Sequence, residues 1–557
     1  MRIFTLCKPY LLSSKYALAI YISLTFTTVI IAIISPYILG DFIDNLIQGA
    51  DVNTILRFCF IFGGLSLLGI VKGYATSLLY IKMQNKMGYG LNKAVLQHIQ
   101  RVSLSYCNNK DIAYISNRVN TDANSLIGFC INVLQRILTN AIKLVVPFII
   151  LLTLNRFITT LMLIFLVVYL LLYFACRKLL YEAGLALRES QARFFSGLLE
   201  QLKHIKLIKT NAIQKEINQR ADGKFTALDR AALHNQKVNY LYTGMDGIIS
   251  TIAQIVLFVI GGLQILSGNF TIGMFTIFTA YFNLMLGAAR YFYGLGAAYQ
   301  HAVVAYDRIQ EILGQEPETY GIAVPDDISS IALHGVGFAY GGEDAKRVVD
   351  NFSSTFTKGN MYAVVGANGA GKSTLISLMM GLYINEFSGE IAYNHTGIRD
   401  IDMTAARRNH IGYAAQEPEL VNDSILYNLT YDNNHERVND AHLKDCIQTL
   451  GMAEFFRKHG LDFKINETNS NISGGEKQKI AILAVLYKNP SVMIFDEPTS
   501  ALDAGTTARF INYLHRVKKE KIIVVITHDA QVQACCDKVV ALSSLRGAKR
   551  RSNPAQT

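Results

Sequence analysis

A glycine-rich octapeptide in the second half of the chain has the composition of a phosphate-binding loop. The apolar run MYAVV leads into Gly366-Ala-Asn-Gly-Ala-Gly-Lys372-Ser373, a complete G-x-x-x-x-G-K-S motif. The glycines let backbone N–H groups wrap around phosphate oxygens, Lys372 can reach the β- and γ-phosphates, and the Ser373 hydroxyl can ligate Mg²⁺. The motif therefore predicts a site for ATP and Mg²⁺ between a strand and the N-terminus of a helix.

More polar side chains follow short apolar runs downstream. The run SVMIF ends in Asp496 and Glu497, the run IIVVIT leads to His528, and Gln416 follows IGYAA. A carboxylate at the end of a core strand suits a Mg²⁺-linked role for Asp496, and the adjacent Glu497 can polarise the attacking water. At the end of a third core strand, His528 can contact the γ-phosphate. These residues predict a catalytic site for ATP hydrolysis.

The segment NISGGEKQ, residues 471–478, resembles the signature motif of ATP-binding cassette (ABC) proteins, and its Ser473 lies 23 residues before Asp496. The phosphate loop, Gln416, this segment, FDEPTSALD and His528 follow one another in the order of that family. With the six membrane spans predicted below, nearly the whole chain resembles an ABC half-transporter of the bacterial exporter type.

The resemblance implies a role for each motif position. Glu497 matches the general base, His528 and Gln416 complete the catalytic set, and Asp503 matches the D-loop aspartate. Ser473, Gly474 and Gly475 match residues that contact ATP bound on another subunit, so the family's site is complete only in a dimer. The implied ATP-binding positions are Tyr340, Gly366, Ala367, Asn368, Gly369, Ala370, Gly371, Lys372, Ser373, Thr374, Ser473, Gly474, Gly475 and Asp496, with Ser373, Gln416 and Asp496 near Mg²⁺.

Three features depart from the family pattern. The signature has Ile472 and Glu476 where many members have Leu and Gln. The segment NETNSN before the signature lacks the glycines that are usual there in exporters. The chain ends in the basic segment LRGAKRRSNPAQT, which we expect to be disordered over 546–557 and to be a truncated or replaced form of the family's final helix.

Composition and hydropathy indicate the elements that carry these motifs. The chain has 557 residues, of which 51% are hydrophobic and only 17% charged, and its mean hydropathy is +0.25. These values disfavour a purely soluble protein. We expect a multidomain fold: an all-α transmembrane domain over 1–315, a linker over 316–328, and an α/β nucleotide-binding domain of the P-loop type over 329–545.

Six apolar stretches are long enough to cross a membrane. The loops that would lie on one side, including extensions over 81–126 and 176–246, carry 21 basic residues, and the opposite loops carry only Arg156. The positive-inside rule then places both termini and the nucleotide-binding domain in the cytoplasm, in a multi-pass protein of the plasma membrane. The predicted spans are 16–36, 54–80, 127–153, 157–176, 247–267 and 270–289.

The charge balance differs between the halves. Residues 1–315 contain 28 Lys and Arg against 14 Asp and Glu, and residues 316–557 contain 25 against 28. Because the hydropathy points to a membrane, we interpret the basic half as facing anionic lipid rather than nucleic acid. The eight cysteines form neither a disulfide framework nor a C-x-x-C zinc pattern.

The sequence thus predicts an ATP hydrolase coupled to transport: a dimer, expected to be a homodimer, that exports an amphipathic or anionic substrate by alternating access. A lipid flippase or an importer on the same fold stays open as an alternative, and so does a heterodimer. An ATP-gated channel and a soluble ABC ATPase are rivals from other classes, and six spans disfavour the latter.

Two further expectations concern coupling and cargo. Short cytoplasmic helices near 105–112 and 204–212 should rest on the nucleotide-binding domain, the second on that of the opposite subunit. The third span carries four polar residues on one helical face, and Lys72 and Arg290 interrupt or end other spans. Unpaired cations in a membrane favour a water-filled cavity over lipid, which suits an anionic substrate. The four residues are Asn132, Arg136, Asn140 and Lys143.

Overall fold

The computed structural model describes residues 2–108, 110, 115–116, 118–341, 346–466, 471–500 and 502–542. It divides the chain into two compact units, one formed by residues 1–97 with 112–314 and the other by 98–111 with 315–557. The expected domains divide the sequence linearly, whereas the units do not, because the segment from His98 to Asp111 groups with the C-terminal unit.

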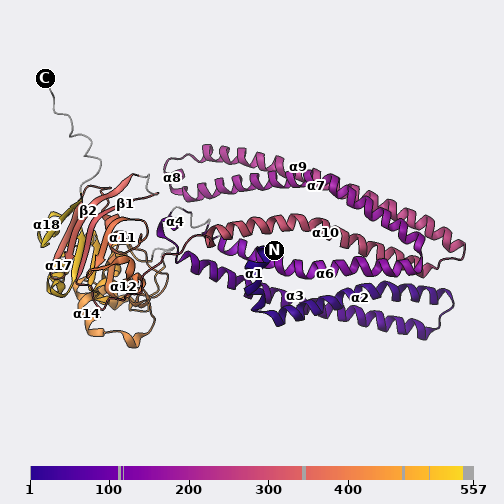
Figure 1. Cartoon of the computed structure of the whole chain (residues 1–557), viewed down its shortest axis with the longest axis horizontal. Coiled ribbons are helices and arrows are strands. Elements are labelled where there is room, and N and C mark those ends of the chain that lie inside the picture. Colours follow the sequence, from indigo (N-terminus) through magenta and orange to yellow (C-terminus); the bar gives the residue numbers. More distant parts are fainter. Residues whose placement is uncertain are drawn as a thin grey trace, which may run out of the picture. The chain divides into compact units, whose positions relative to one another are not determined.

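The first unit is built of long helices (Figure 1). Six of its helices, counted over the described residues, are long and apolar enough to cross a membrane, and the six predicted stretches fall on them. The helices are α1 (Arg2–Leu12), α2 (Lys15–Ile47), α3 (Val52–Ile99), η1 (Arg118–Asp122), α6 (Ala123–Leu154), α7 (Arg156–Lys203), α8 (Ile205–Thr210), α9 (Gln214–Leu266) and α10 (Ile272–Leu313).

Several of these helices are much longer than a membrane is thick. A span needs about 20 residues, whereas α7 has 48 and α9 has 53. At a rise of about 1.5 Å per residue, each extends for about 70–80 Å. They lie side by side along most of their length (Figure 1). The expected helical extension over 176–246 is therefore present, formed by the end of α7, by α8 and by the first half of α9.

Close backbone contact joins α2 to α10. A Cβ atom on Gly273 would lie 2.1 Å from the Gly40 carbonyl oxygen, so only glycine permits this approach. The Asp44 carboxylate accepts hydrogen bonds from the Gly273 N–H at 2.7 Å and the Thr271 hydroxyl at 2.6 Å, beside the N-terminus of α10. Tyr281 is buried and donates to the Ile33 carbonyl at 2.6 Å. These contacts fix one helix pair of the bundle.

The second unit contains two sheets with helices around them (Figure 1). One is antiparallel, in the order β2-β1-β4-β5, and the other is parallel, in the order β6-β7-β8-β3-β9. The strands are β1 (Ser330–Ala339), β2 (Arg347–Thr357), β3 (Met361–Gly366), β4 (Ser388–Tyr393), β5 (Thr396–Gly397), β6 (Ile411–Ala414), β7 (Val492–Asp496), β8 (Ile522–Ile526) and β9 (Lys538–Leu542).

Helices of very different length follow or flank these strands. They are α11 (Lys372–Met379), η2 (Ile398–Asp400), α12 (Met403–His410), α13 (Ile425–Thr430), η3 (His435–Arg437), α14 (Asp440–Thr449), α15 (Ala453–His459), α16 (Gly474–Lys488), α17 (Ala504–Val517), η4 (Lys518–Glu520) and α18 (Ala530–Ala534). Together the two sheets and these helices form the expected α/β unit.

The parallel register brings the predicted motifs to one edge of the sheet. Asp496 at the end of β7 pairs with Ile526 of β8, and Ile526 pairs with Val364 of β3. Ala414 at the end of β6 pairs with Phe495 of β7. Since β7 and β8 are buried throughout, their apolar runs form the core and their polar ends emerge at the carboxyl edge.

One of the two predicted short helices packs on the second unit. Helix α4 (Leu104–Asn108) belongs to that unit, Leu104 contacts its apolar core, and the Ser105 hydroxyl donates to the Glu386 carboxylate. The predicted helix ran to 112, but residues 109 and 111–114 lie outside the described residues. Helix α8 confirms a short helix near 204–212, and its contact with an opposite subunit stays a prediction.

Candidate functional site

The phosphate loop has the backbone that its glycines predict. Gly369 and Gly371 have φ angles of +76° and +93°, which residues with a side chain rarely adopt. A Cβ atom on Gly371 would lie 2.9 Å from the Val348 carbonyl oxygen. The Lys372 ammonium folds back over the loop and donates to the Gly366 carbonyl at 2.8 Å. The loop thus presents its backbone and one ammonium group at the N-terminus of α11.

Asp496 is the buried carboxylate of the site. It ends the fully buried strand β7 and is only 6% exposed. Burial raises the pKa of Asp496, and the nearby Glu497 charge raises it further, while a hydrogen bond from the Ser373 hydroxyl at 3.3 Å opposes the shift. Two hard oxygen donors, a carboxylate and a hydroxyl, therefore face each other at this point, and such a pair fits Mg²⁺.

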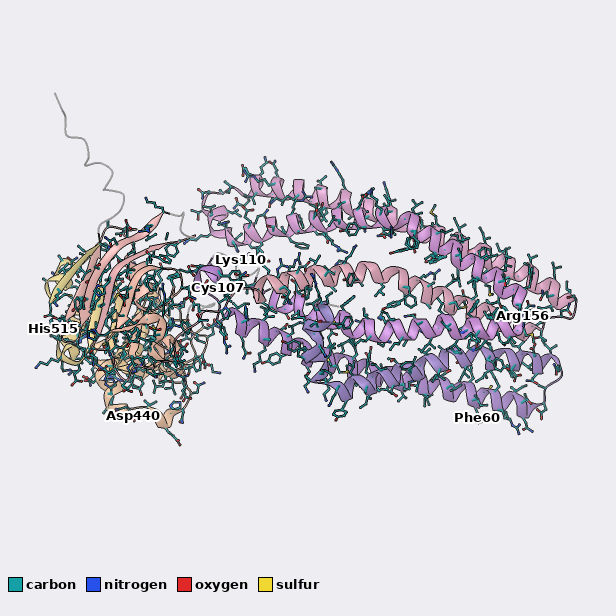
Figure 2. All side chains as sticks on the ribbon, viewed as in Figure 1. Phe60, Cys107, Lys110, Arg156, Asp440 and His515 are labelled. Carbon is teal, nitrogen blue, oxygen red and sulfur yellow. The ribbon has the colours of Figure 1, made fainter. Side chains whose placement is uncertain are left out.

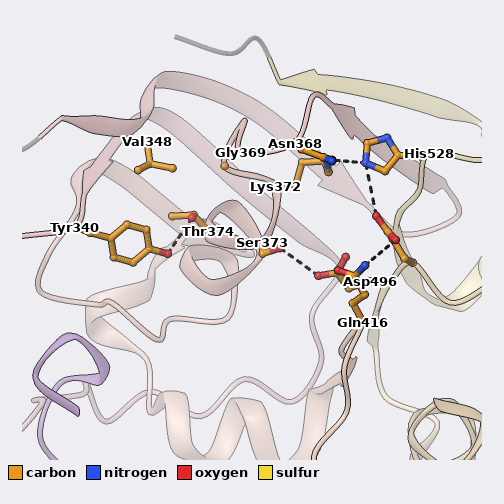
Figure 3. A pocket seen from close by; sticks show the side chains of 12 residues that line it. Tyr340, Val348, Asn368, Gly369, Lys372, Ser373, Thr374, Gln416, Asp496 and His528 are labelled. Atoms are coloured by element: carbon orange, nitrogen blue, oxygen red, sulfur yellow. Dashed lines mark hydrogen bonds and ion pairs between the residues drawn. The ribbon is translucent and has the colours of Figure 1, made fainter. Parts of the chain in front are cut away.

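Glu497 is held in a strained conformation by several contacts. Its φ angle is +47°, and its N–H donates to the Ile526 carbonyl at 2.9 Å, which turns the chain sharply as it leaves the strand. The Gln416 amide donates to one Glu497 carboxylate oxygen at 2.9 Å, and His528 Nε2 lies 3.6 Å from the other. Figure 3 shows this network across the pocket. The carboxylate thus lines the cavity and is oriented by the Gln416 amide.

A second contact of His528 links it to the phosphate loop. Its Nε2 atom lies 3.0 Å from the Lys372 ammonium, as Figure 3 also shows. Because an ammonium group can only donate, Nε2 is the acceptor in this contact and does not at the same time donate to the Glu497 carboxylate. Lys372, His528, Glu497 and Gln416 thus form one continuous chain of contacts between the phosphate loop and strand β6.

Tyr340 lies at the other end of the cavity. Its hydroxyl lies 3.0 Å from the Thr374 hydroxyl, and its ring is 48% exposed (Figure 3). The ring packs edge-on against Phe338 and Tyr383, at centroid distances of 4.9 and 5.9 Å. An exposed aromatic face supported from behind is suited to stacking on a purine base.

One cavity of about 660 Å³ collects most of the predicted ATP-site residues. Val348 of β2 also lines it and was not predicted, because nothing in the sequence of a strand shows which neighbouring loop it will contact. Gly366, Ala367 and Ala370 belong to the loop but do not line the cavity. The lining residues are Tyr340, Val348, Asn368, Gly369, Gly371, Lys372, Ser373, Thr374, Gln416, Asp496, Glu497 and His528.

The signature residues Ser473, Gly474 and Gly475 do not line this cavity. Ser473 is the N-cap of α16, and its hydroxyl accepts from the Glu476 N–H at 3.2 Å, while the Glu476 carboxylate accepts from the Ser473 N–H at 2.7 Å. Burial opposes ionisation, but these hydrogen bonds prevail and hold the pKa of Glu476 below its usual value. The signature thus begins a well-capped helix within the same unit.

Gln478 is a site residue that the sequence reasoning missed. It lies on α16, is 4% exposed, and its amide donates to the Glu497 carbonyl at 2.9 Å. Its amide oxygen accepts from the Ser500 hydroxyl at 3.1 Å. Gln478 therefore connects the signature helix to the backbone of the predicted general base. Its place in the quoted signature was a signal, but no spacing rule indicates which backbone oxygen it meets.

The cations predicted within the membrane spans lie in three different environments, and one expectation about them is wrong. Arg290 was expected to be unpaired, but its guanidinium lies 2.8 Å from the Asp246 carboxylate, which is folded beside it from α9. Lys72 has a buried ammonium that meets no hydrogen-bond partner among the described residues and lies outside the cavities described here. Asn132, Arg136 and Lys143 line one pocket, as predicted, whereas Asn140 does not.

Comparison with known proteins agrees with this architecture. The ABC transporter transmembrane region matches residues 18–289, and the ABC transporter domain matches residues 349–500. The chain is 25% identical to a Lactococcus lactis protein named as a lactococcin-G-processing and transport ATP-binding protein, over 92% of this chain and 73% of that one. It is 26% identical to a putative multidrug export ATP-binding/permease protein of Bacillus subtilis, over 93% and 92%.

A solved structure shares the fold. The structure of a bacterial Atm1-family ABC exporter with ATP bound matches with a TM-score of 0.78 at 18% identity, over 96% of this chain and 93% of that one. Both ABC regions are thus fused in one polypeptide, six membrane-type helices precede the strands of the nucleotide-binding unit, and the relatives are named for transport or putative export. The chain belongs to the ABC transporters and has the architecture of an exporter-type half-transporter.

Proposed function

We propose that two copies of this half-transporter form an ATP-driven exporter for an amphipathic, anionic molecule. The observation that carries the proposal is that one cavity is lined by the residues expected to hydrolyse ATP, which are Lys372, Glu497, His528 and Gln416. The signature residues of the same chain lie outside this cavity. A second copy that supplies Ser473 would complete each site with a hydroxyl and a helix N-terminus directed at the γ-phosphate.

In this proposal the residues of the cavity divide the work of hydrolysis. Tyr340 stacks on the base, the loop from Gly366 to Thr374 holds the phosphates, and Lys372 neutralises their charge. Glu497 accepts a proton from the attacking water, and Gln416, which donates to Glu497 in the structure, orients that carboxylate. His528 leaves its contact with Lys372 to meet the γ-phosphate.

Mg²⁺ fits the same cavity. Ser373, Asp496 and Gln416 would hold it through oxygen atoms, which are the donors that this ion prefers. The ion would neutralise phosphate charge and orient the phosphates. The buried Asp496 carboxylate accepts a hydrogen bond from the Ser373 hydroxyl, and a bound cation would offset the remaining cost of keeping it ionised.

We further propose that closure of two nucleotide-binding units drives an alternating-access cycle in a plasma membrane, with both termini on the cytoplasmic side. The excess of 21 basic residues against one supports this orientation. Helix α4, which packs on the nucleotide-binding unit through Leu104 and Ser105, supports a mechanical link to the membrane helices.

Replacement of Glu497 by Gln tests the proposal. The amide keeps the shape but cannot accept the proton, so ATP hydrolysis in nanodiscs should fall by about 100-fold or more while nucleotide binding remains. The matched control is Glu454→Gln on α15, an exposed position outside the cavity. Near-normal hydrolysis by the Glu497→Gln protein would show that Glu497 is not the general base. Uphill, ATP-dependent transport into proteoliposomes then separates a pump from a channel.

A further inference from the structure

A second pocket lies within the membrane-type helices of the first unit. It has a volume of about 470 Å³ and lies between α2, α3 and α6. The lining positions recur every three or four residues on each helix, so one face of each helix contributes. A cavity of this size fits a small molecule or part of a larger one. Its lining residues are Tyr21, Thr25, Thr28, Val29, Gly73, Thr76, Ser77, Tyr80, Asn132, Gln135, Arg136, Thr139 and Lys143.

The charge of this pocket has one sign. Arg136 and Lys143 lie two turns apart on α6, about 10 Å along the helix axis, and no acidic residue lines the pocket. Among the described residues, no carboxylate forms an ion pair with either cation, in contrast to Arg290, which has Asp246. The acidic residues of α2 are Asp41 and Asp44, near its C-terminal end, and Asp44 is engaged by Gly273 and Thr271.

Hydroxyl and amide groups surround the two cations. The Asn132 amide donates to the Tyr80 hydroxyl at 3.0 Å, and the Tyr21 hydroxyl lies 3.4 Å from the Gln135 side-chain oxygen. These contacts join α2 and α3 to α6 and hold the polar wall in place. They leave the Arg136 guanidinium and the Lys143 ammonium without a competing anion among the lining residues that the structure describes, so the pocket offers two charged donors beside a polar wall.

Apolar surface adjoins the polar wall. The rings of Tyr21 and Tyr80 lie 6.0 Å apart between their centroids, and Val29, which lines the same pocket, is buried. At Gly73 a Cβ atom would meet nothing within 4 Å, so the α3 backbone opens onto space there. A ligand with an anionic group and an apolar body would therefore find partners for both parts.

We infer that this pocket binds the anionic group of an amphipathic molecule, a phosphate or a carboxylate, between Arg136 and Lys143. Unpaired cations within membrane helices are costly, and an anion that arrives with its own apolar body offsets that cost. The inference rests on the proposed function for its link to transport, but binding at the pocket requires no hydrolysis and is tested separately.

The absence of tryptophan from the sequence makes a direct binding experiment possible. Thr28→Trp places a single reporter in the pocket. Phe60→Trp places one on α3 at a residue that is 79% exposed and points away from the bundle (Figure 2). Each protein is placed in phosphatidylcholine nanodiscs and titrated with dibromostearoyl lysophosphatidic acid or with the matching lysophosphatidylcholine, whose brominated tail quenches tryptophan fluorescence on contact.

We expect the anionic probe to quench the pocket reporter at about tenfold lower concentration than the zwitterionic probe, which corresponds to about 1.4 kcal/mol. The Phe60→Trp reporter should respond equally to both, since it senses the lipid phase. Arg136→Gln with Lys143→Gln should abolish the preference, and Arg136→Lys with Lys143→Arg should retain it. Equal quenching of the pocket reporter by both probes, or a preference that survives the Gln pair, would overturn the inference.

Two arms then identify the source of the anion. If it belongs to a transported molecule, the anionic probe stimulates ATP hydrolysis in a saturable way, and the Gln pair loses this stimulation. If it belongs to a resident lipid, phosphatidylglycerol in the discs displaces the probe without such stimulation. Glu497→Gln should keep the binding preference, so failure of the hydrolysis proposal and failure of the pocket are distinguishable.

Discussion

The nucleotide cavity and the membrane pocket differ in how their charged groups are held. In the nucleotide cavity, Lys372 contacts His528, and Glu497 contacts both His528 and Gln416. In the membrane pocket, Arg136 and Lys143 have no carboxylate partner among the described residues. The nucleotide cavity holds its geometry through contacts within the chain. The membrane pocket has no such carboxylate for its two cations in the described part of the chain, so an anionic ligand would be their partner.

The origin of the residues explains this difference. The nucleotide cavity forms at the ends of adjacent parallel strands, whose register places Asp496, Ile526 and Val364 side by side. The membrane pocket forms on the faces of three helices that are joined by two side-chain contacts, Asn132 with Tyr80 and Tyr21 with Gln135. The strand register therefore fixes the positions of the residues for ATP hydrolysis. On the helix faces, by contrast, single substitutions can change which ligand the pocket binds.

The largest effect is expected in the nucleotide cavity, whose charged groups contact one another. Lys372→Ala removes the ammonium that contacts both the Gly366 carbonyl and His528. Because charge-assisted hydrogen bonds to phosphate are strong, we expect ATP affinity to fall by about 100-fold or more. Equilibrium binding of a fluorescent ATP analogue to the full chain measures this. Lys444→Ala, an exposed position on α14, is the control, and unaltered binding in Lys372→Ala would show that the loop does not hold the phosphates.

The next prediction compares paired and unpaired cations within the membrane helices. Arg290→Gln removes the ion-pair partner of the largely buried Asp246 carboxylate and should lower the stability of the bundle. Because Arg290 is itself partly exposed, we expect this loss to be only about 1–3 kcal/mol. Lys143→Gln removes a cation that lacks a carboxylate and should leave stability unchanged or raise it.

Apparent unfolding temperatures of both variants in the same detergent measure this contrast. Equal losses in the two variants would mean that Lys143 has a partner of its own, and the comparison between the sites would fail. Arg290→Lys, which keeps the charge, should recover part of the loss, because one ammonium can still reach Asp246 but cannot match the guanidinium geometry.

The residues at the strand ends could be predicted from the sequence because each follows a short apolar run. Such a run is typical of a buried strand, and a polar residue directly after it is expected at the edge of the sheet. Sequence patterns also predicted the six apolar helices, whose composition follows from the membrane. They could not predict that Asp246 meets Arg290 or that Gln478 meets the Glu497 carbonyl. Both contacts join residues from different helices or from a helix and a strand end, so tertiary packing decides them.

The missed residue gives a prediction of its own. Gln478→Leu keeps the volume but removes the hydrogen bond to the Glu497 carbonyl, so the strained φ angle of Glu497 loses one support. We expect kcat to fall by about tenfold while KM for ATP changes little, because Gln478 does not line the cavity. Gln448→Leu, an exposed change on α14, is the control. A rise in KM with unchanged kcat would contradict a positioning role.

The smallest expected effect concerns the first turn of the signature helix. Glu476 caps α16 with its carboxylate, and its pKa is lowered by hydrogen bonds from Ser473. A carboxylate whose pKa is lower in the folded state stabilises the fold above its unfolded pKa of about 4.3, and this stabilisation is lost as the pH falls through the folded pKa. Glu476→Gln keeps the capping hydrogen bond but removes the charge at the helix N-terminus, so it should cost about 0.5 kcal/mol near neutral pH.

The pH dependence separates this charge from the packing around it. The difference in apparent unfolding temperature between the native chain and Glu476→Gln should be about 1–2 °C near neutral pH. It should shrink as the pH falls below the unfolded pKa of about 4.3 and vanish below the lowered pKa of Glu476 in the folded chain. Glu476→Ala, which loses the hydrogen bond as well, should keep a difference at both ends of the range. A Gln variant whose deficit does not change with pH would mean that the carboxylate charge contributes nothing to the cap.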